Sequence, residues 1–252
     1  MRVAALYRYP FKGLSPEPLE RVSLKAGEFF PGDRLYAIEN GPSGYDPASP
    51  VHQPKIKFLT LARNARLAGL TTRYDNVTTA LTIERDGRIV ASAELATEAG
   101  RTAIARFVEA TCADEMRGPA RVLSAADGFR FTDSRSGFVS LINLASVRTI
   151  AHTVGRSLDP LRFRANIYVT GLQAWEEFSL VGKKLRVGPL LLEPVKPIDR
   201  CFAIDVEPGE GVRDTSLLPL MEHVFGHHDC GIYARVLTGG ELGLADELQI
   251  EA

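Results

Sequence analysis

Short runs of β-branched and aromatic residues, broken by glycine and proline, recur along the whole chain and restrict the folds open to it. Residues 3–9, 138–142 and 190–195 are runs of this kind, and their length and composition are typical of β-strands. Asp86-Gly87 separates two more runs and has the chemistry of a hairpin turn. Few segments have apolar residues at helical spacing. The sequence therefore predicts a β-rich α+β fold with few helices, arranged as two small β-barrels or sandwiches side by side.

Local patterns also predict the positions of individual elements. Helical spacing predicts helices over residues 102–111, 144–154 and 215–225, and Asn143 is a suitable N-cap for the second of them. Apolar and β-branched composition predicts further strands over residues 58–62, 65–71, 163–169 and 202–206.

Length and charge limit the classes of function. The chain has 252 residues, enough for one large β domain or for two of ordinary size. Gly118-Pro119 marks a boundary that divides the chain into residues 1–118 and 119–252. The composition, 45% hydrophobic and 24% charged, is that of an ordinary globular protein. Because the net charge is −1, the chain has no overall attraction for nucleic acid or an anionic membrane, so an anion site must be a local cluster of cations.

The N-terminus and the cysteines both bear on the compartment. Charged residues and a proline occur within the first dozen positions, and no apolar core of signal-peptide length is present. No uninterrupted apolar stretch is long enough to span a bilayer. Three widely spaced cysteines, Cys112, Cys201 and Cys230, fit reduced thiols better than a disulfide framework. We therefore expect a cytoplasmic protein without a membrane partner.

Cys201 is the strongest candidate for a chemically active side chain. It lies in the stretch PVKPIDRCFAIDVEPGEGVRD, residues 194–214, between two β-type runs. Two strands joined by a turn would hold the thiol where the backbone bends, with the Arg200 guanidinium beside it. A thiol acts as a metal ligand or nucleophile only as the thiolate, and an adjacent positive charge lowers its pKa. A buried, inert cysteine is the alternative, because cysteine is among the most frequently buried residue types.

A second group of potential metal ligands is the run His227-His228-Asp229-Cys230. Imidazole, carboxylate and thiolate all bind transition metals. However, adjacent side chains diverge, and no C-x-x-C or H-x-x-x-H spacing accompanies them. The run also follows a predicted helix, whose C-terminal end favours histidine. We expect no dedicated metal site there.

Several ordered motifs resemble a known family. The run RFRANIYVTG, then Trp175-Glu176-Glu177, then Asp199-Arg200-Cys201, then Pro208 and Gly-Val-Arg-Asp resemble the MOSC domain, the C-terminal domain of molybdenum cofactor sulfurases. The N-terminal YPFKGLSPEPLERVSL followed by GDRLYAIEN is similar to the β-barrel domain that precedes MOSC in the amidoxime-reducing proteins. The resemblance covers nearly the whole chain. It implies an N-terminal MOSC-associated β-barrel domain over residues 1–118 and a MOSC β-barrel over residues 119–252.

The resemblance further implies a molybdenum cofactor bound in a cleft between the domains. Arginine and lysine suit the cofactor's phosphate, asparagine suits its pterin, and a thiolate suits molybdenum. Cys201 matches the cysteine proposed to ligate molybdenum in that family. Lys12 matches the lysine of the family's YPVKS loop, and Gly13 stands where the family often has serine. The other implied cofactor-binding residues are Arg34, Asp133, Ser134, Arg164, Asn166 and Arg200.

Three functions stay open for such a site. The resemblance favours an oxidoreductase that reduces N-hydroxylated small molecules, with the proline-rich loop 41–54 shaping access to the cleft. The chain has no C-x-x-C cluster and no nucleotide-binding glycine fingerprint, so electrons would come from a separate iron–sulfur or flavin protein. Alternatively, Cys201 carries a persulfide for sulfur transfer, or the chain is a non-catalytic molybdopterin-binding module.

Overall fold

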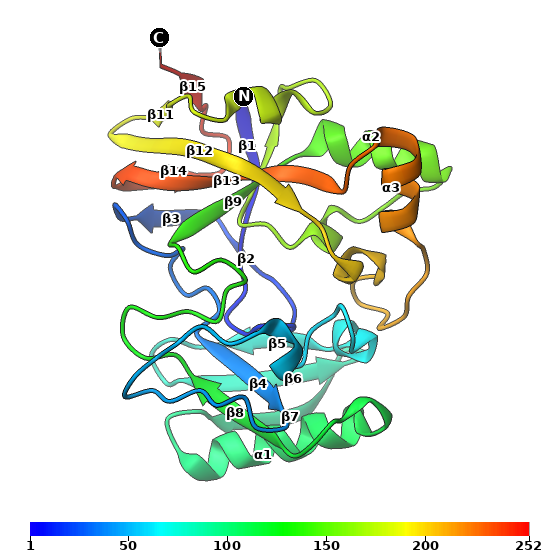
Figure 1. The fold of residues 1–252 in the computed structure, drawn as a ribbon. Coiled ribbons are helices and arrows are strands. Elements are labelled where there is room, and N and C mark those ends of the chain that lie inside the picture. Colours follow the sequence, from blue (N-terminus) through cyan, green and yellow to red (C-terminus); the bar gives the residue numbers. More distant parts are fainter. Residues whose placement is uncertain (252) are drawn as a thin grey trace.

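The computed structural model describes residues 1–251, and it shows a β-rich fold with few helices, as predicted (Figure 1). The strands are β1 (Arg2–Arg8), β2 (Glu17–Leu19), β3 (Arg21–Leu24), β4 (Tyr36–Asn40), β5 (Thr71–Tyr74), β6 (Ala80–Arg85), β7 (Arg88–Glu94), β8 (Ala120–Ser124), β9 (Phe138–Asn143), β10 (Ile167–Thr170), β11 (Leu185–Val187), β12 (Leu190–Asp199), β13 (Asp229–Thr238), β14 (Gly240–Gly243) and β15 (Gln249–Ile250). The α-helices are α1 (Glu98–Thr111), α2 (Leu144–Val154) and α3 (Leu217–Phe225).

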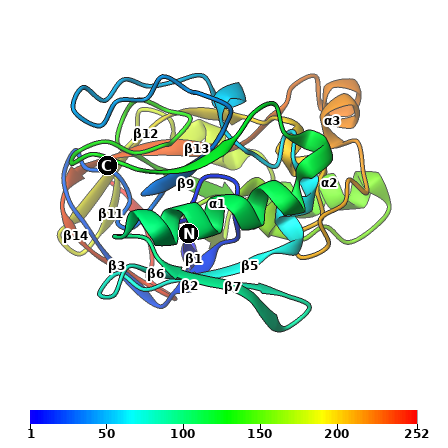
Figure 2. The ribbon, with the colours of Figure 1, turned by 90° about the horizontal axis from the view of Figure 1, so that it is seen from below.

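The strands are divided between two halves of the molecule. The upper half in Figure 1 contains a curled eight-stranded sheet with the order β15-β11-β12-β13-β9-β10-β1-β2, and β14 pairs with β3 beside it. The lower half contains the β4-β8 pair and the β5-β6-β7 sheet. Figure 2, a view from below, shows α1 across the outer side of the lower half.

The chain crosses between the halves in a way that composition does not reveal. β1 lies between β10 and β2 in the large sheet, where Arg2 is paired with Thr170 and Leu6 with Ile167. After β2 and β3, which also pair in the upper half, the chain descends to the lower half, and it returns after β8, which pairs with β4. The division into residues 1–118 and 119–252 stays a prediction.

Separate hydrophobic cores stabilise the two halves. One face of the large sheet buries aliphatic side chains from β1, β9, β10 and β13, among them Leu6, Leu141 and Ile232. Strand alternation explains this face, because Ile232, Ala234 and Val236 on β13 are buried while the intervening Arg235 is exposed. The lower core joins β4, β6 and α1, so each half packs around its own apolar centre.

Local signals placed α2 correctly. The Asn143 side chain accepts a hydrogen bond from the Ala145 N–H at the start of the helix. Gly155 ends it in the left-handed conformation, with φ of 76°. Helix α3 begins at Leu217, two residues later than predicted, and its first N–H is bonded to the carboxylate of Asp205.

Four predicted strands are wrong or shorter than expected. Residues 58–62 form no strand and contribute only an isolated bridge between Phe58 and Glu39. Residues 65–69 form a 3-10 helix, Ala65–Gly69, before β5. Residues 202–205 form another, Phe202–Asp205, because Asp205 turns inward to cap α3 and this breaks the alternation of a strand. The predicted strand 163–169 begins only at Ile167, since a 3-10 turn, Pro160–Phe163, and a left-handed Arg164 precede it.

Within residues 1–251, no helix has both the length and the hydropathy that crossing a bilayer requires. The longest α-helix has 14 residues, whereas a spanning helix needs about 20.

Candidate functional site

A cavity between the two halves is lined by loops from both of them. It encloses about 1020 Å³ of empty space, including its opening to solvent. The structure brings all nine predicted site residues to its wall: Lys12, Gly13, Arg34, Asp133, Ser134, Arg164, Asn166, Arg200 and Cys201. Residues up to 189 positions apart in sequence therefore meet in one place.

Arg34 and Arg164 line the cavity and pack on the ring of the buried Tyr9. The guanidinium carbons of Arg34 and Arg164 lie 4.4 and 4.5 Å from the centre of the Tyr9 ring. Both arginines have a left-handed backbone, with φ of 46° and 50°. Non-glycine residues adopt this conformation at an energetic cost, and such strain is found preferentially at functional sites.

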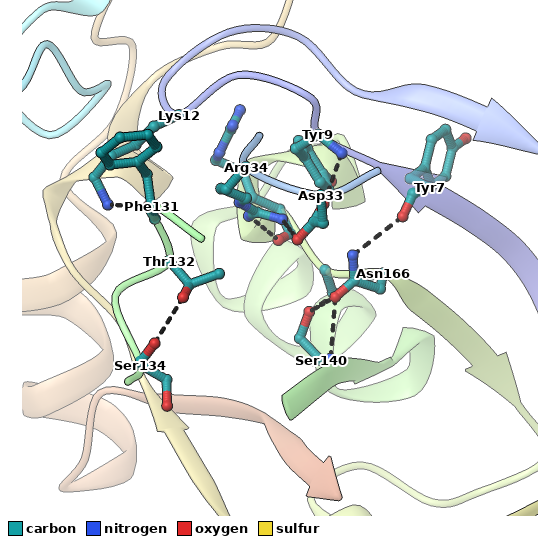
Figure 3. A network of polar contacts seen from close by, with 12 residues as sticks. Tyr7, Tyr9, Lys12, Asp33, Arg34, Phe131, Thr132, Ser134, Ser140 and Asn166 are labelled. Carbon is teal, nitrogen blue, oxygen red and sulfur yellow. Dashed lines mark hydrogen bonds and ion pairs between the residues drawn. The ribbon is translucent and has the colours of Figure 1, made fainter. Parts of the chain in front are cut away.

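Arg34 forms an ion pair with a carboxylate, whereas Arg164 does not within residues 1–251. Asp33 forms an ion pair with Arg34 and also accepts a hydrogen bond of 2.7 Å from the Tyr9 N–H (Figure 3). Burial tends to lower the pKa of Arg34, but Asp33 and Tyr9 outweigh it, so the pKa is raised. Within residues 1–251, the Arg164 guanidinium has no carboxylate partner and donates no hydrogen bond, and its Nη2 is buried. Burial and the neighbouring Arg34 lower the pKa of Arg164 to about 10.

The unbalanced charge of Arg164 has a direct consequence. An arginine with a pKa of about 10 is still a cation at neutral pH. Arg164 is partly exposed, but its buried Nη2 has no hydrogen-bond partner in the described part of the chain and the nearby Asp33 is already paired with Arg34, so its charge is costly. An anionic group bound in the cavity would relieve that cost.

Lys12 is a further buried cation, and it is tied to the loop before β9. Its Nζ donates to the Phe131 carbonyl at 3.0 Å (Figure 3). It also donates to the Asp133 carboxylate at 2.5 Å. Burial lowers the pKa of Lys12, and the ion pair with Asp133 partly offsets this effect. The Asp133 side chain is 54% exposed, so the pair is screened from one side by solvent. Lys12 and Asp133 thus join the N-terminal loop to the polar loop 132–137.

Gly13 and Ser134 shape the backbone of the cavity wall. Gly13 has φ of 84°, and a Cβ built on it would lie 2.8 Å from the carbonyl oxygen of Leu59. A serine at this position would therefore require a backbone shift, which explains the glycine. Ser134 accepts a hydrogen bond from the Thr132 hydroxyl through its backbone carbonyl (Figure 3).

Asn166 is engaged within the protein. Its Oδ1 accepts from the Ser140 hydroxyl at 2.8 Å and its Nδ2 donates to the Tyr7 carbonyl at 3.2 Å (Figure 3). The residue is only 2% exposed. Asn166 therefore joins β1 to β9 and β10 and leaves little hydrogen-bonding capacity for a ligand.

Cys201 lies two residues after the end of β12 at Asp199. It directly precedes the 3-10 helix Phe202–Asp205 as its N-cap residue. Of the three cysteines, all within residues 1–251, it alone is not buried. Burial raises the pKa of Cys112 to about 11 and that of Cys230 to about 12. The thiol accessible to a ligand is thus Cys201.

The guanidinium of Arg200 points into the protein. Its Nε donates to the Cys230 carbonyl at 2.7 Å and its Nη1 to the Phe163 carbonyl at 2.8 Å. Arg200 therefore fixes the backbone beside Cys201, and it also lines the cavity.

The run His227-His228-Asp229-Cys230 does not converge. Cys230 is buried, whereas His227 packs against Trp175 and Phe178. In the part of the chain that the structure describes, no three His, Cys, Asp or Glu side chains are grouped so that they could hold a metal ion.

Among the residues of the cavity wall that the sequence patterns did not identify, two bear on the function of the site. Tyr233 on β13 is opposite Ser140 in the strand register, and its position between the buried Ile232 and Ala234 is the signal that could have revealed it. Burial raises the pKa of Tyr233. The other is Arg162, whose side chain is completely buried.

Arg162 is the centre of an ion network that joins the backbones next to Arg164 and Cys201. It forms ion pairs with Glu207 and Asp214 and donates to the Ile204 carbonyl at 3.3 Å. Arg156 pairs with the same two carboxylates from outside. The turn before Arg164 and the 3-10 helix after Cys201 are thereby held as one unit.

We expect Arg162→Met to lower the free energy of unfolding by about 3 kcal/mol, because it removes a fully buried cation and leaves the partly buried Glu207 and Asp214 carboxylates with only Arg156 as a partner. Arg156→Gln is the matched control, since Arg156 is 43% exposed and pairs with the same groups; its cost should be below about 1 kcal/mol. Urea unfolding measures both values. Equal losses in the two variants would contradict the central position of Arg162.

The fold and the cavity define a β-rich protein with a cationic cleft and one accessible thiol between its halves. Residues 1–119 match the MOSC N-terminal beta barrel domain, and residues 129–249 match the MOSC domain. The chain therefore belongs to the MOSC domain family and has the N-terminal β-barrel domain of that family, which confirms the resemblance found in the sequence.

Solved structures with a similar fold include two bacterial proteins. The YUAD protein from Bacillus subtilis is 15% identical, with a TM-score of 0.46, over 99% of this chain and 94% of that one. YiiM from Geobacillus stearothermophilus is 20% identical, with a TM-score of 0.36, over 45% of this chain and 54% of its own length. This chain thus covers about half of YiiM. No curated protein matches the chain.

Proposed function

We propose that this protein binds the molybdenum cofactor in the cavity and reduces N-hydroxylated small molecules, with Cys201 as a ligand of molybdenum. The observation that supports this most is the unbalanced Arg164 cation on the same cavity wall as the accessible Cys201 thiol. A ligand with both an anionic group and a soft metal matches this pair.

The residues present fit such a group. Arg164, with its unpartnered buried Nη2, and Lys12 would face the cofactor's phosphate. Cys201 would supply the thiolate ligand. Asn166 and Arg200 would act indirectly, because most of their hydrogen bonds already hold the cavity wall. When bound, the cofactor supplies a two-electron redox centre and takes up oxygen.

A side chain of the protein would donate protons for the reduction. Reduction of R–NH–OH consumes two electrons and two protons and yields R–NH2 and H2O. Tyr233 lines the cavity, and burial raises the pKa of its phenol. Its hydroxyl therefore keeps a proton at neutral pH and is a source close to Cys201.

The test is to purify the protein from a host that makes the cofactor and to measure molybdenum, pterin and reduction of an amidoxime by dithionite. We expect about one molybdenum per chain, as one site requires, together with turnover. If the protein contained molybdenum and pterin but showed no turnover, it would be a non-catalytic binding module and not a reductase.

The accessible Cys201 thiol also favours a second candidate, sulfur transfer through a persulfide. In that case intact-mass analysis of the same preparation would show one additional sulfur atom, which a reductant removes and which Cys201→Ser lacks. Such a preparation would hold no molybdenum, and the reductase function would be wrong.

A further inference from the structure

Two large apolar side chains are exposed beside the thiol. Phe202 follows Cys201 directly and is 55% exposed, and Val212 is 52% exposed. Both belong to the segment that the Arg162 network holds against the protein. Exposed apolar side chains that are held in place within a polar rim can serve as the centre of a contact surface.

Arg213 joins these residues to the lower half of the molecule. Its Nη1 donates to the Phe202 carbonyl at 2.8 Å, and its Nη2 donates to the Leu61 and Ala62 carbonyls at 3.0 and 2.7 Å. Leu61 and Ala62 line the cavity together with Cys201. The exposed apolar side chains and the segment around Ala62 therefore form one continuous rim.

The excess of positive charge on this rim comes from the segment 55–66. Residues 55–66 contain four basic residues and no acidic residue. Arg66 pairs with Asp114, whereas Lys55 and Arg63 are exposed and form no ion pair within residues 1–251. Arg213 is bonded to carbonyls and not to a carboxylate.

Exposed carboxylates lie nearby as well: Asp133, which pairs with Lys12, and Asp199 line the cavity, and Glu210 lies two residues before Val212. Because the whole chain has a net charge of −1, the cationic rim is a local feature and not a reflection of the overall charge.

We propose that Lys55, Arg63, Phe202, Val212 and Arg213, here termed the docking face, bind an acidic electron-transfer protein. This inference rests on the proposed function, in which each turnover takes two electrons, one from each of two reduced donor molecules, which are oxidised as the N–O bond is broken. An apolar centre within a polar, charged rim is the usual anatomy of a protein interface. Complementary charge would guide an acidic donor to the side of the molecule where Cys201 opens to solvent.

The probe is a purified acidic [2Fe–2S] ferredoxin, whose binding is measured by calorimetry at several salt concentrations. We expect the double variant Arg63→Glu/Phe202→Ser to bind at least about tenfold more weakly, because it reverses a rim charge and removes the apolar centre. Amidoxime reduction driven by ferredoxin should fall in parallel, whereas reduction driven by dithionite should be unchanged.

The matched control is Arg88→Glu/Ile89→Ser. Arg88 and Ile89 are an exposed cation and an exposed apolar residue on β7, away from the cavity wall. Equal weakening in both double variants, or binding that is independent of salt, would overturn the docking face. Salt-sensitive binding to phosphatidylserine vesicles, lost in Arg63→Glu/Phe202→Ser, would assign the face to a membrane and also overturn it. If wild-type protein shows no turnover with dithionite, the proposed function fails, but the calorimetry still decides whether the face binds an acidic protein.

Discussion

Cys201→Ser is expected to lose molybdenum and to reduce amidoxime more than about 100-fold more slowly than wild type, because even residues that merely orient a metal ligand contribute 10- to 100-fold. Serine has nearly the same shape as cysteine but offers a hard oxygen in place of a soft sulfur. The fold should be unaffected, since Cys201 is partly exposed and is not part of a hydrophobic core. Metal analysis and steady-state kinetics measure the two effects.

The control for this variant is Cys112→Ala. Cys112 is fully buried in the lower core, and its thiol is not part of the cavity wall. We expect it to keep full molybdenum content and turnover while losing some thermal stability. Molybdenum retained in Cys201→Ser at the wild-type level would mean that Cys201 is not a ligand.

Arg164→Met is expected to have opposite effects on stability and on ligand binding. Removing an unbalanced buried cation should leave the free energy of unfolding of the cofactor-free protein within about 1 kcal/mol of wild type, since the lost contact with the Tyr9 ring is worth about that much. At the same time, the cavity loses the positive charge that would attract a bound anion. Phosphate, which should raise the melting temperature of the wild type, should not raise that of the variant.

Arg34→Met provides the contrast. It leaves the buried Asp33 without its partner, so we expect a loss of about 3 kcal/mol or more in the free energy of unfolding. Thermal melts with and without phosphate distinguish the two variants. If Arg164→Met were destabilised as strongly as Arg34→Met, its charge would already be balanced within the protein.

The lowered pKa of Arg164 also makes the stability of the protein depend on pH. Its folded value, about 10, lies below its usual 12.5. Between these values the unfolded chain binds more protons than the folded one, so this group contributes stability that rises with pH across that window. Below pH 10 the group is charged in both states, and its cost to the folded state is constant.

Much of the fold could be predicted because local rules agreed with the tertiary structure. Asn143 and Gly155 mark both ends of α2, and the alternation on β13 separates its buried and exposed faces. The failures occurred where a distant contact decided the local conformation. Residues 202–205 have the composition of a strand, but Asp205 turns inward to bond the first N–H of α3. Single-sequence patterns contain no information about that partner.

The candidate site was less accessible to sequence reasoning. The nine residues on the cavity wall come from distant segments, and the family resemblance rather than their spacing brought them together. Composition could not reveal that the side chains of Asn166 and Arg200 form hydrogen bonds within the protein. Nor could it reveal that the Arg164 Nη2 has no hydrogen-bond partner among the residues that the structure describes. Nor could composition predict that Arg162 is buried. Its burial depends on ion pairs with Glu207 and Asp214, which are distant in sequence.

The place of β1 in the large sheet has a consequence for how the chain reaches its native state. β1 is enclosed between β2 and β10, and Arg2 pairs with Thr170. During synthesis on the ribosome, the first strand must therefore wait, with one edge unpaired, until some 170 residues have emerged. Contacts this remote in sequence slow folding and prolong the exposure of an aggregation-prone edge. The arginines at both ends of this strand, Arg2 and Arg8, place charge at the positions that would protect it during that wait.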